Sequence, residues 1–333
     1  MLTDVGRATF RDALRAVVAG ELRGSRETVF MGETVRWIGA TGLAKGLYDE
    51  FGPDQVIETP VSENAILGAA LGLALAGFRP IVEIYSADFL LVVANEVMND
   101  IAKWRHQQRS PEALPITIRG WMGATGGLGP EHSQCMEPYF HHAPGLTIVV
   151  PSTVRDGVGL LRSAIRSSDP VLFLEHRNLY DMVGELPADP EFCLPIGSAD
   201  VVRVGKDLTI VAWAWMRHRA EEASAELAEH GLSVELIDPR TIRPMDWGTI
   251  LKSASKTKHL LVVEEAPRTG SVSAEVLARV SEANPHTLIR LGRVTMPDAI
   301  HPYSPELESP VLPKSVDIVR AAVELCSDIN RTK

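Results

Sequence analysis

A carboxylate at the start of an apolar helix is the feature of this sequence that most clearly points to chemistry. The segment Thr59–Asn64 leads into Ala65–Gly77, which is rich in Gly and Ala and apolar on every side, so that all its faces are expected to be buried. Thr59 is predicted to cap the helix and Pro60 to occupy its first position, which puts Glu63 beside unpaired N–H groups. Glu63 is either a group for proton transfer, with a pKa tuned by poor hydration, or simply a favourable first-turn acid.

A glycine-rich segment carries the second candidate group, His132. The segment Gly120–Gln134 follows a predicted strand, so it should lie at the carboxyl edge of a sheet, where open α/β sheets place their ligands. It is either a ligand-binding loop or a mobile surface loop. His132 and Cys135 have a spacing that metal sites use, but no second pair follows nearby to complete four ligands.

Length and charge exclude several classes of function. The chain has 333 residues, more than one ordinary core, and its 45% apolar and 23% charged residues are typical of soluble globular proteins. A net charge of −10, with no long Lys/Arg run, argues against nucleic acid as a partner. The longest apolar run, Ala65–Gly77, is too short to span a bilayer, so no membrane association is expected. The dinucleotide-binding and P-loop glycine motifs are both absent from the sequence.

Cysteine usage and the first residues bear on location. Cys135, Cys193 and Cys326 are far apart and odd in number, which fits free thiols in a reducing compartment. Residues 1–7 lack the apolar core of a signal peptide. We therefore expect a cytoplasmic protein, or one in an organelle matrix if a targeting segment has been removed.

Strand-like and helix-like segments alternate along the chain, as in α/β layers with largely parallel sheets. Helices are predicted over 9–22, 65–76, 89–104, 154–166, 217–230, 247–255, 271–280 and 315–326. Strands are predicted over 28–32, 80–85, 115–119, 147–151, 171–174, 208–212, 233–237 and 260–263. A stretch rich in Pro and acids indicates a linker. We predict two doubly wound α/β domains, residues 1–184 and 197–333, joined by a linker over 185–196.

The order of several motifs resembles one family. The motifs are Glu63, Ser86–Phe89, His132–Gln134, Pro144–Leu146, Val150–Ser152, Asp298 and Pro302–Ser304. Together they resemble the beta subunit of the decarboxylating component of 2-oxo acid dehydrogenases, the thiamine-diphosphate-dependent family of the pyruvate and branched-chain enzymes. The resemblance covers nearly the whole chain. It implies a first domain like the pyrimidine-binding domain of transketolase and a second like transketolase's C-terminal domain.

The resemblance implies a role for each candidate residue. Glu63 corresponds to the carboxyl group that hydrogen-bonds the cofactor's aminopyrimidine, so that this ring can remove the thiazolium C2 proton. Phe89 corresponds to an aromatic that stacks on the pyrimidine, although the residue alone also fits an ordinary core aromatic. His132 corresponds to the histidine that assists acyl transfer to lipoamide. Glu33 matches a family glutamate near the cofactor, but the following segment, 34–39, departs from the usual pattern.

The resemblance also bears on metals and partners. Thiamine enzymes typically hold the diphosphate through Mg²⁺ with a Gly-Asp-Gly sequence, and this chain has no Gly-Asp dipeptide. We therefore infer that the Mg²⁺ ligands lie on a separate alpha subunit, in an α₂β₂ tetramer with the cofactor at the interface. The family often binds K⁺, here at Ile116, Ala164, Ile165 and Asp169. Ser167 stands where an acid is common, which leaves K⁺ binding open.

Three functions follow from these observations. The first is a beta subunit that decarboxylates a small 2-oxo acid on thiamine diphosphate and passes the acyl group to the lipoyl domain of a transacylase. The second is a two-subunit thiamine-dependent acyl or ketol transferase in a biosynthetic pathway, suggested by segment 34–39 and by Trp213 and Trp215. The third is a non-catalytic scaffold that docks a transacylase. The joint presence of Glu63, Phe89 and His132 favours an enzyme.

Overall fold

The strand-forming segments of the first half build the sheet that carries the candidate site. In the computed structural model, which describes residues 6–39, 41–110 and 112–327, this sheet has the strand order β12-β6-β7-β5-β4-β2-β3. Its strands are β2 (Thr28–Glu33), β3 (Val56–Thr59), β4 (Arg79–Ile84), β5 (Thr117–Met122), β6 (Thr147–Val149), β7 (Val171–His176) and β12 (Thr241–Arg243). Neighbouring strands run parallel except β12, which pairs antiparallel with β6. The parallel order brings the carboxyl ends of β2 to β5 to one edge of the sheet.

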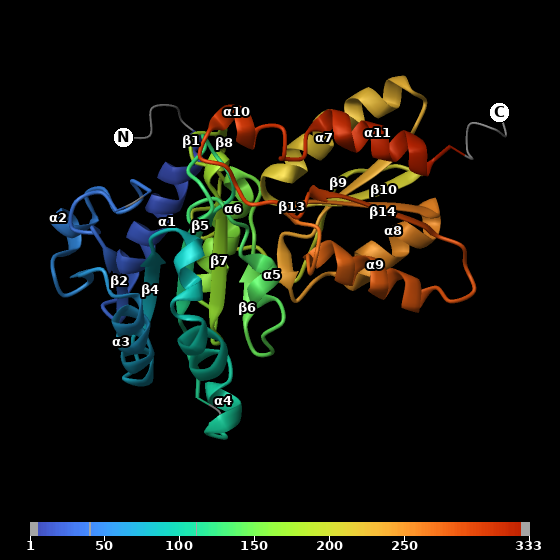
Figure 1. Ribbon diagram of the computed structural model, residues 1–333. Helices are drawn as coiled ribbons and strands as arrows, with labels where there is room; N and C mark the ends of the chain where they lie inside the picture. Colours follow the sequence, from blue (N-terminus) through green and yellow to red (C-terminus); the bar gives the residue numbers. More distant parts are fainter. Residues whose placement is uncertain (1–5, 40, 111, 328–333) are drawn as a thin grey trace.

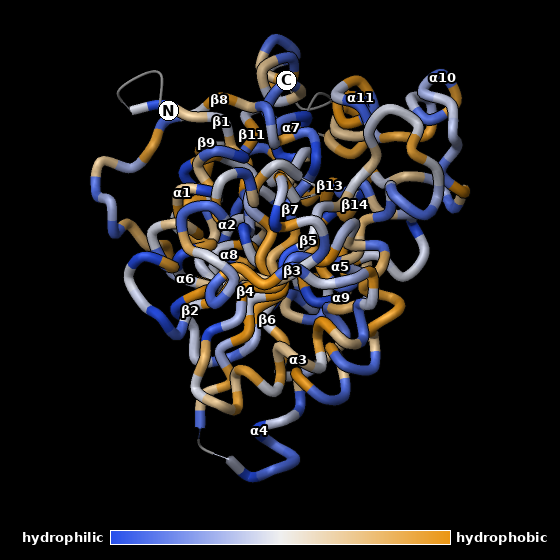
Figure 2. The backbone as a smooth tube through the Cα atoms, turned by 90° about the vertical axis from the view of Figure 1, so that its left-hand side faces the viewer, coloured by the Kyte–Doolittle hydropathy of each residue, from blue (hydrophilic) through white to orange (hydrophobic). Residues whose placement is uncertain are grey.

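Helices cover both faces of this sheet (Figure 1). α1 (Phe10–Gly24) and α6 (Val154–Ile165) pack together over one face, where Thr9 and Thr153 cap them as side-chain acceptors. α3 (Glu63–Leu75) covers the other face beside β4. The shorter helices of this half are α2 (Leu47–Phe51), α4 (Trp104–Gln107), α5 (Glu137–Phe140) and the 3₁₀ turn η3 (Arg177–Leu179). Figure 2 shows the apolar segments gathered at the centre of the sheet, with α4 polar at the periphery.

The second half folds into a sheet of the same type. Its strand order is β14-β13-β10-β11-β9, and every pair is parallel except β11 with β9. The strands are β9 (Asp200–Arg203), β10 (Leu208–Ala212), β11 (Val234–Asp238), β13 (His259–Pro267) and β14 (Arg290–Met296). The helices are α7 (Ala214–Glu229) and α11 (Ser315–Leu325) on one face, α8 (Trp247–Thr257) and α9 (Val272–Ala283) on the other, and the short α10 (Pro305–Glu308). The predicted fold class is therefore confirmed.

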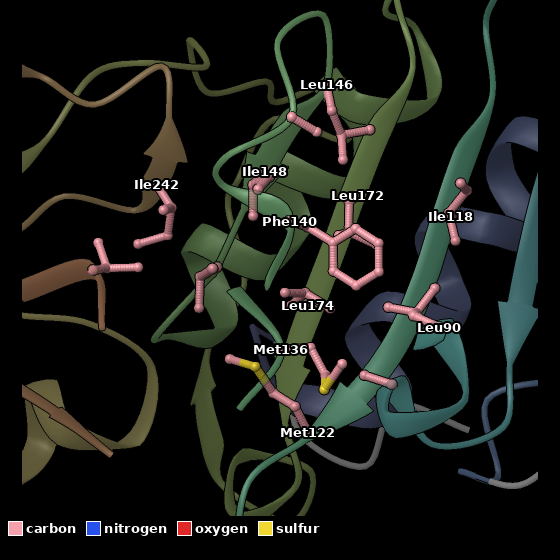
Figure 3. Packing of buried hydrophobic residues seen from close by; sticks show 14 of the residues in the cluster. Leu90, Ile118, Met122, Met136, Phe140, Leu146, Ile148, Leu172, Leu174 and Ile242 are labelled. Carbon is pink, nitrogen blue, oxygen red and sulfur yellow. The ribbon is translucent and has the colours of Figure 1, made fainter. Parts of the chain in front are cut away.

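The two halves share structure at their boundary. β12 comes from the second half but extends the sheet of the first. A single apolar cluster includes Ile148 and Leu172 from the first sheet and Ile242 from β12 (Figure 3). The predicted linker 185–196 is packed rather than free, because Leu194 donates its N–H to the Gly159 carbonyl 3.1 Å away. Just before it, β8 (Val183–Glu185) pairs with β1 (Arg7–Thr9).

The division into residues 1–184 and 197–333 stays a prediction, and residues 1–5 and 328–333 of these ranges lie outside the described residues. Among the helices that the structure describes, none combines the length and the apolarity needed to cross a bilayer.

The prediction of one continuous α-helix over 89–104 is wrong. The chain forms a 3₁₀ turn, η1 (Ala87–Leu91), then a π-helical segment, η2 (Glu96–Ile101), before α4. The backbone hydrogen bonds change along this stretch: Val92 donates its N–H to the Phe89 carbonyl at 3.0 Å, an i→i+3 bond, whereas Ala102 donates to the Val97 carbonyl at 3.0 Å, an i→i+5 bond. Asn95, just before the π segment, donates through Nδ2 to Asp100 Oδ2, five residues on, at 3.1 Å.

The predicted start and full burial of α3 are also wrong. Thr59 ends β3, and the helix begins at Glu63 with Ser62 as its N-cap residue. Ile66, Leu67 and other residues of one face are buried. The opposite face is exposed and consists mainly of small residues: Asn64, Ala65, Gly68, Ala69, Gly72, Leu75 and Ala76. This face, hereafter the small-residue face, leaves space around Gly68 and Gly72, where an added Cβ would meet nothing within 4 Å.

Candidate active site

The parallel strand order gathers the predicted site residues at one edge of the first sheet. Glu33 is the last residue of β2, and Glu63 opens α3 after β3. Phe89 lies in η1 after β4, and His132 lies in the glycine loop, residues 123–134, after β5. β3, β2, β4 and β5 are consecutive neighbours, so the four residues follow adjacent strand ends (Figure 1). We call this place the first edge.

Acidic side chains cluster at the ends of β2 and β3. The pKa of Glu33 is raised above its ordinary value. Burial is the largest cause, followed by the Glu63 carboxylate and then the Glu58 carboxylate. Glu58 also accepts hydrogen bonds from the backbone N–H groups of Thr34 at 3.1 Å and Arg36 at 2.7 Å. These bonds hold the chain where it leaves β2, and Thr34 has a φ of +56°. Sequence reasoning missed Glu58, although an acid next to the end of a strand and five residues before Glu63 was a usable signal.

Aromatic side chains surround His132. The rings of Phe89 and His132 meet edge to face with centroids 5.5 Å apart, and the His132 ring stacks on Trp121 at 6.3 Å. Tyr85 meets Trp121 edge to face at 6.4 Å, and the Arg177 guanidinium lies 4.8 Å above the Trp121 ring. Phe89 and His132 are half-buried, so part of each ring faces outward. Phe89 thus packs against the core with part of its ring and exposes the rest, which fits either alternative. Trp121 is a contact that sequence reasoning did not single out.

The glycine loop is hydrogen-bonded at its ends. Gly123 donates its N–H to the Gln134 carbonyl at 3.2 Å, which closes the loop. Asp88 Oδ1 accepts from the N–H and from the side-chain amide of Gln134, at 3.1 and 3.0 Å, and Ser86 Oγ donates to Asp88 Oδ2. These bonds tie the loop to the start of η1 and favour a fixed loop over a mobile one.

The paired tryptophans have different surroundings. Trp213 is buried and donates its indole N–H to Glu137 Oε1 at 2.9 Å, so it packs the interior. Trp215 lies beside His176, with ring centroids 6.3 Å apart, and lines a cavity of about 280 Å³ between the halves. Other residues around this cavity are Ala124 and Gly126 of the glycine loop and Leu312. One indole therefore serves packing and the other a cavity.

The predicted K⁺ loop is occupied by protein cations. Arg79 Nη1 donates to the backbone carbonyls of Ile165 and Ser167 at 3.1 and 3.0 Å, and Asp169 forms an ion pair with Arg105. Ile116 and Ala164, the other predicted ligands, are buried in the same region. Guanidinium groups therefore already supply positive charge in this region, and K⁺ binding stays a prediction.

Among the residues that the structure describes, no group of three or more His, Cys, Asp or Glu side chains is arranged to hold a metal ion. His132 and Cys135 do not form such a group, and Cys135 Sγ instead lies 3.9 Å from Glu265 Oε1. Burial, followed by the neighbouring carboxylates, raises the pKa of the Cys135 thiol well above its usual value, which disfavours a nucleophilic thiolate.

Comparison with known proteins identifies both domains. The family model of the transketolase pyrimidine-binding domain matches residues 7–182, and that of the transketolase C-terminal domain matches residues 197–318. A split-gene transketolase, solved as an inactive beta4 tetramer, shares the fold with a TM-score of 0.77 at 20% identity, covering 96% of this chain and 98% of that one.

Relatives at higher identity define the family more closely. The chain is 41% identical to the beta subunit of acetoin:2,6-dichlorophenolindophenol oxidoreductase of Cupriavidus necator, over 87% of this chain and 86% of the relative. It is 38% identical to the pyruvate dehydrogenase E1 component subunit beta of Rhizobium meliloti, over 97% and 71%. It is also 38% identical to the 2-oxoisovalerate dehydrogenase subunit beta of Bacillus subtilis, over 90% and 93%.

The chain belongs to the family of E1 beta subunits of the thiamine-dependent 2-oxo acid dehydrogenases, with the two transketolase-like domains of that family. The resemblance derived from the sequence is thereby confirmed. The named relatives are dehydrogenase and oxidoreductase subunits, which favours the first of the three functions over a biosynthetic transferase.

Proposed function

We propose that this chain is the beta subunit of a dehydrogenase that decarboxylates a small 2-oxo acid on thiamine diphosphate and passes the acyl group to a lipoyl domain. The observation that carries the proposal is the position of Glu63, Phe89 and His132 after strands that end at the first edge, with the Phe89 and His132 rings in contact. An acid and an aromatic ring at one edge can bind the aminopyrimidine ring of a cofactor. A histidine beside them can assist transfer of the acyl group that the cofactor carries.

The acids of the first edge suit a site that keeps a proton close to a ring nitrogen. When bound, thiamine diphosphate supplies a thiazolium carbon that adds to the substrate carbonyl and then accepts the electrons released with carbon dioxide. Glu63 would hold a proton on the pyrimidine nitrogen. Glu33 would lie beside this group: burial, and then the Glu63 and Glu58 carboxylates, raise the pKa of Glu33, so its carboxyl group interacts with that of Glu63.

The aromatic residues would orient the ring and serve the later transfer. Phe89 has an open ring portion that can stack on a planar ring. His132 contacts the Phe89 edge, so it would lie next to the bound cofactor and can give a proton to the sulfur that leaves when a dithiolane opens.

The small-residue face of α3 supports a second polypeptide in the site. Glu63 begins the helix that exposes this face, and small residues allow close approach of another helix. We propose that an alpha subunit supplies the Mg²⁺ ligands for the diphosphate in an α₂β₂ tetramer, and that the small-residue face is covered in this assembly, against a second copy of this chain. A lipoylated transacylase would be the acyl acceptor. A cytoplasmic or organelle-matrix location remains part of the same proposal.

A second candidate substrate class is favoured by one relative. The oxidoreductase subunit of Cupriavidus necator, 41% identical, is named for acetoin rather than for a 2-oxo acid. An acyloin would use the same acid, aromatic and histidine, because the bond that breaks also lies next to a carbonyl carbon.

Co-purification of the untagged partner, followed by assay of the complex, tests the proposal. Pyruvate, branched-chain 2-oxo acids and acetoin would be supplied separately, with 2,6-dichlorophenolindophenol as electron acceptor and labelled carbon dioxide as a second readout. Release of carbon dioxide from a 2-oxo acid is the expected result. Dye reduction with acetoin alone would support the second candidate, and inactivity with every substrate would contradict both.

A further inference from the structure

The second half of the chain reaches across to the glycine loop. We propose that Glu265, Glu308 and Tyr303 are positioning residues that fix this loop, and with it His132, for the acyl-transfer step. We call the three residues the loop clamp. The inference rests on the proposed function, because it gives His132 its role in acyl transfer.

Glu265 holds the first turn of the loop. It lies in β13 and is buried, and its Oε1 accepts the N–H of Ala124 at 2.7 Å. Its other oxygen is 3.0 Å from His176 Nε2 at the end of β7. Burial alone would raise the pKa of Glu265, but His176 and the Ala124 N–H lower it, so the carboxylate is charged and the bond to the loop is charge-assisted. At Gly123, with a φ of +88°, an added Cβ would collide with the His176 ring.

Glu308 and Tyr303 hold the middle and the end of the loop. Glu308 Oε2 accepts the N–H of Gly127 at 3.0 Å, and its side chain is buried. The Tyr303 hydroxyl donates to the Glu131 carboxylate at 2.8 and 2.9 Å, next to His132. An added Cβ on Gly129 would collide with the Tyr303 ring, so the glycine allows close contact with the second half.

These contacts are spaced so that the whole loop is held. They fall at residues 124, 127 and 131, while the Gln134 end is fixed by Asp88. The contacts of the His132 ring with Phe89 and Trp121 orient the imidazole but do not fix the backbone that carries it. The loop backbone depends on groups from both halves, and the second half therefore contributes to where the imidazole lies.

The experiment compares variants of the clamp in the complex with the alpha subunit. Tyr303→Phe removes the hydroxyl but keeps the ring against Gly129, and Glu308→Ala removes the acceptor of the Gly127 N–H. Glu308→Gln keeps an acceptor oxygen and should restore wild-type behaviour. Glu306→Ala is the matched control, because Glu306 lies on the same helix and bonds to Ser304 rather than to the loop.

Hydrogen–deuterium exchange of peptides covering residues 123–134 is the first readout. Loss of the acceptor of the Gly127 N–H should speed exchange roughly tenfold in Glu308→Ala, and loss of the Tyr303 hydroxyl should speed it less in Tyr303→Phe, with no change in the control. The second readout separates the half-reactions: acylation of a lipoyl domain should slow by roughly tenfold, while dye-coupled decarboxylation and KM for the 2-oxo acid stay at the wild-type values.

Unchanged loop exchange in both clamp variants would overturn the proposal. So would faster exchange with equal loss in the two half-reactions, or a Glu308→Gln variant that behaves like Glu308→Ala. A wild-type complex that does not decarboxylate any 2-oxo acid would instead contradict the proposed function, and the exchange data would still decide whether the clamp holds the loop.

Discussion

The carboxyl edges of the two sheets both end in acidic side chains, but these lie in very different surroundings. At the first edge Glu33 and Glu63 are only half-buried. At the second, Glu264 and Glu265 at the end of β13 are buried and accept backbone N–H groups, Ser273 at 2.8 Å and Ala124 at 2.7 Å. One sheet therefore leaves its edge open to a ligand, and the other turns its edge toward the first half and supports it.

Two other strands of the second sheet also end in buried residues. β10 runs directly into the buried Trp213, and β11 ends at Asp238, which is buried. Burial, then repulsion by Asp156, raises the pKa of Asp238 to about 7. Similar architecture thus gives a partly exposed edge and a buried edge, depending on what covers the strand ends. Changes at the first edge should alter activity, and changes at the second should alter stability or loop position.

The largest expected effect is that of Glu63→Gln. Because the amide cannot exchange the proton, the variant should slow exchange of the cofactor's C2 proton in the complex by about 10²–10⁴-fold, the usual contribution of a positioned acid–base group. NMR of the quenched reaction measures this rate. Glu264→Gln, the matched change at the second edge, should lower the unfolding midpoint and leave the exchange rate unchanged. A Glu63→Gln complex with the wild-type rate would contradict the role of Glu63.

His132→Ala should have the next largest effect. Without a group to protonate the leaving sulfur, lipoyl acylation should slow by about 10²-fold, with a smaller loss in decarboxylation. Single-turnover measurements of the two half-reactions separate these effects. His142→Ala serves as the control, since His142 lines a cavity away from the first edge. If both half-reactions lose the same factor in His132→Ala, the assignment to acyl transfer is wrong.

Glu137→Gln should change how stability depends on pH. Burial raises the pKa of Glu137 to about 7 although Trp213 donates to it, so the folded chain favours the protonated acid. The stabilisation is fully present below the ordinary pKa of 4.5 and is lost as the pH rises through about 7. The wild type should lose about 3 kcal/mol relative to Glu137→Gln between pH 4 and pH 8, as judged by urea unfolding. Parallel stability curves would exclude this protonation.

Phe89→Leu should have the smallest effect. Loss of an offset stacking contact is worth about 0.5–1.5 kcal/mol beyond area burial, which corresponds to a rise of about two- to tenfold in the Kd of thiamine diphosphate. Calorimetric titration of the complex measures it. An unchanged Kd would place Phe89 outside the cofactor contact, contrary to the proposal.

The local sequence pattern was enough to predict which residues lie at the first edge. It did not predict which residues of the second half hold the glycine loop in place. Glu63 and the glycine loop were predicted because each follows a strand, and the parallel sheet then brings them together. The bond between Glu265 and Ala124 joins residues 141 positions apart, and no local pattern indicates it. The adjacent acids at the end of an apolar strand were nevertheless a signal, because buried carboxylates need partners.

Tertiary packing explains the errors in the predicted elements. β14 was missed because Arg290, Gly292 and Arg293 break its apolar alternation, and its pairing with β13 determines the strand. The segment 89–104 has helical periodicity, but its backbone hydrogen bonds change from i→i+3 in η1 to i→i+5 at η2, which divides it. Full burial of α3 was predicted from its apolar composition. In this chain the small-residue face of the helix is exposed.

Titration of thiamine diphosphate with Mg²⁺ into this chain alone, and into its complex with the alpha subunit, tests the central claim most directly. If the first edge is half of a site, calorimetry will detect tight binding in the complex and none by the chain alone. Tight binding of one cofactor per chain without the alpha subunit would contradict the claim that a second polypeptide completes the site.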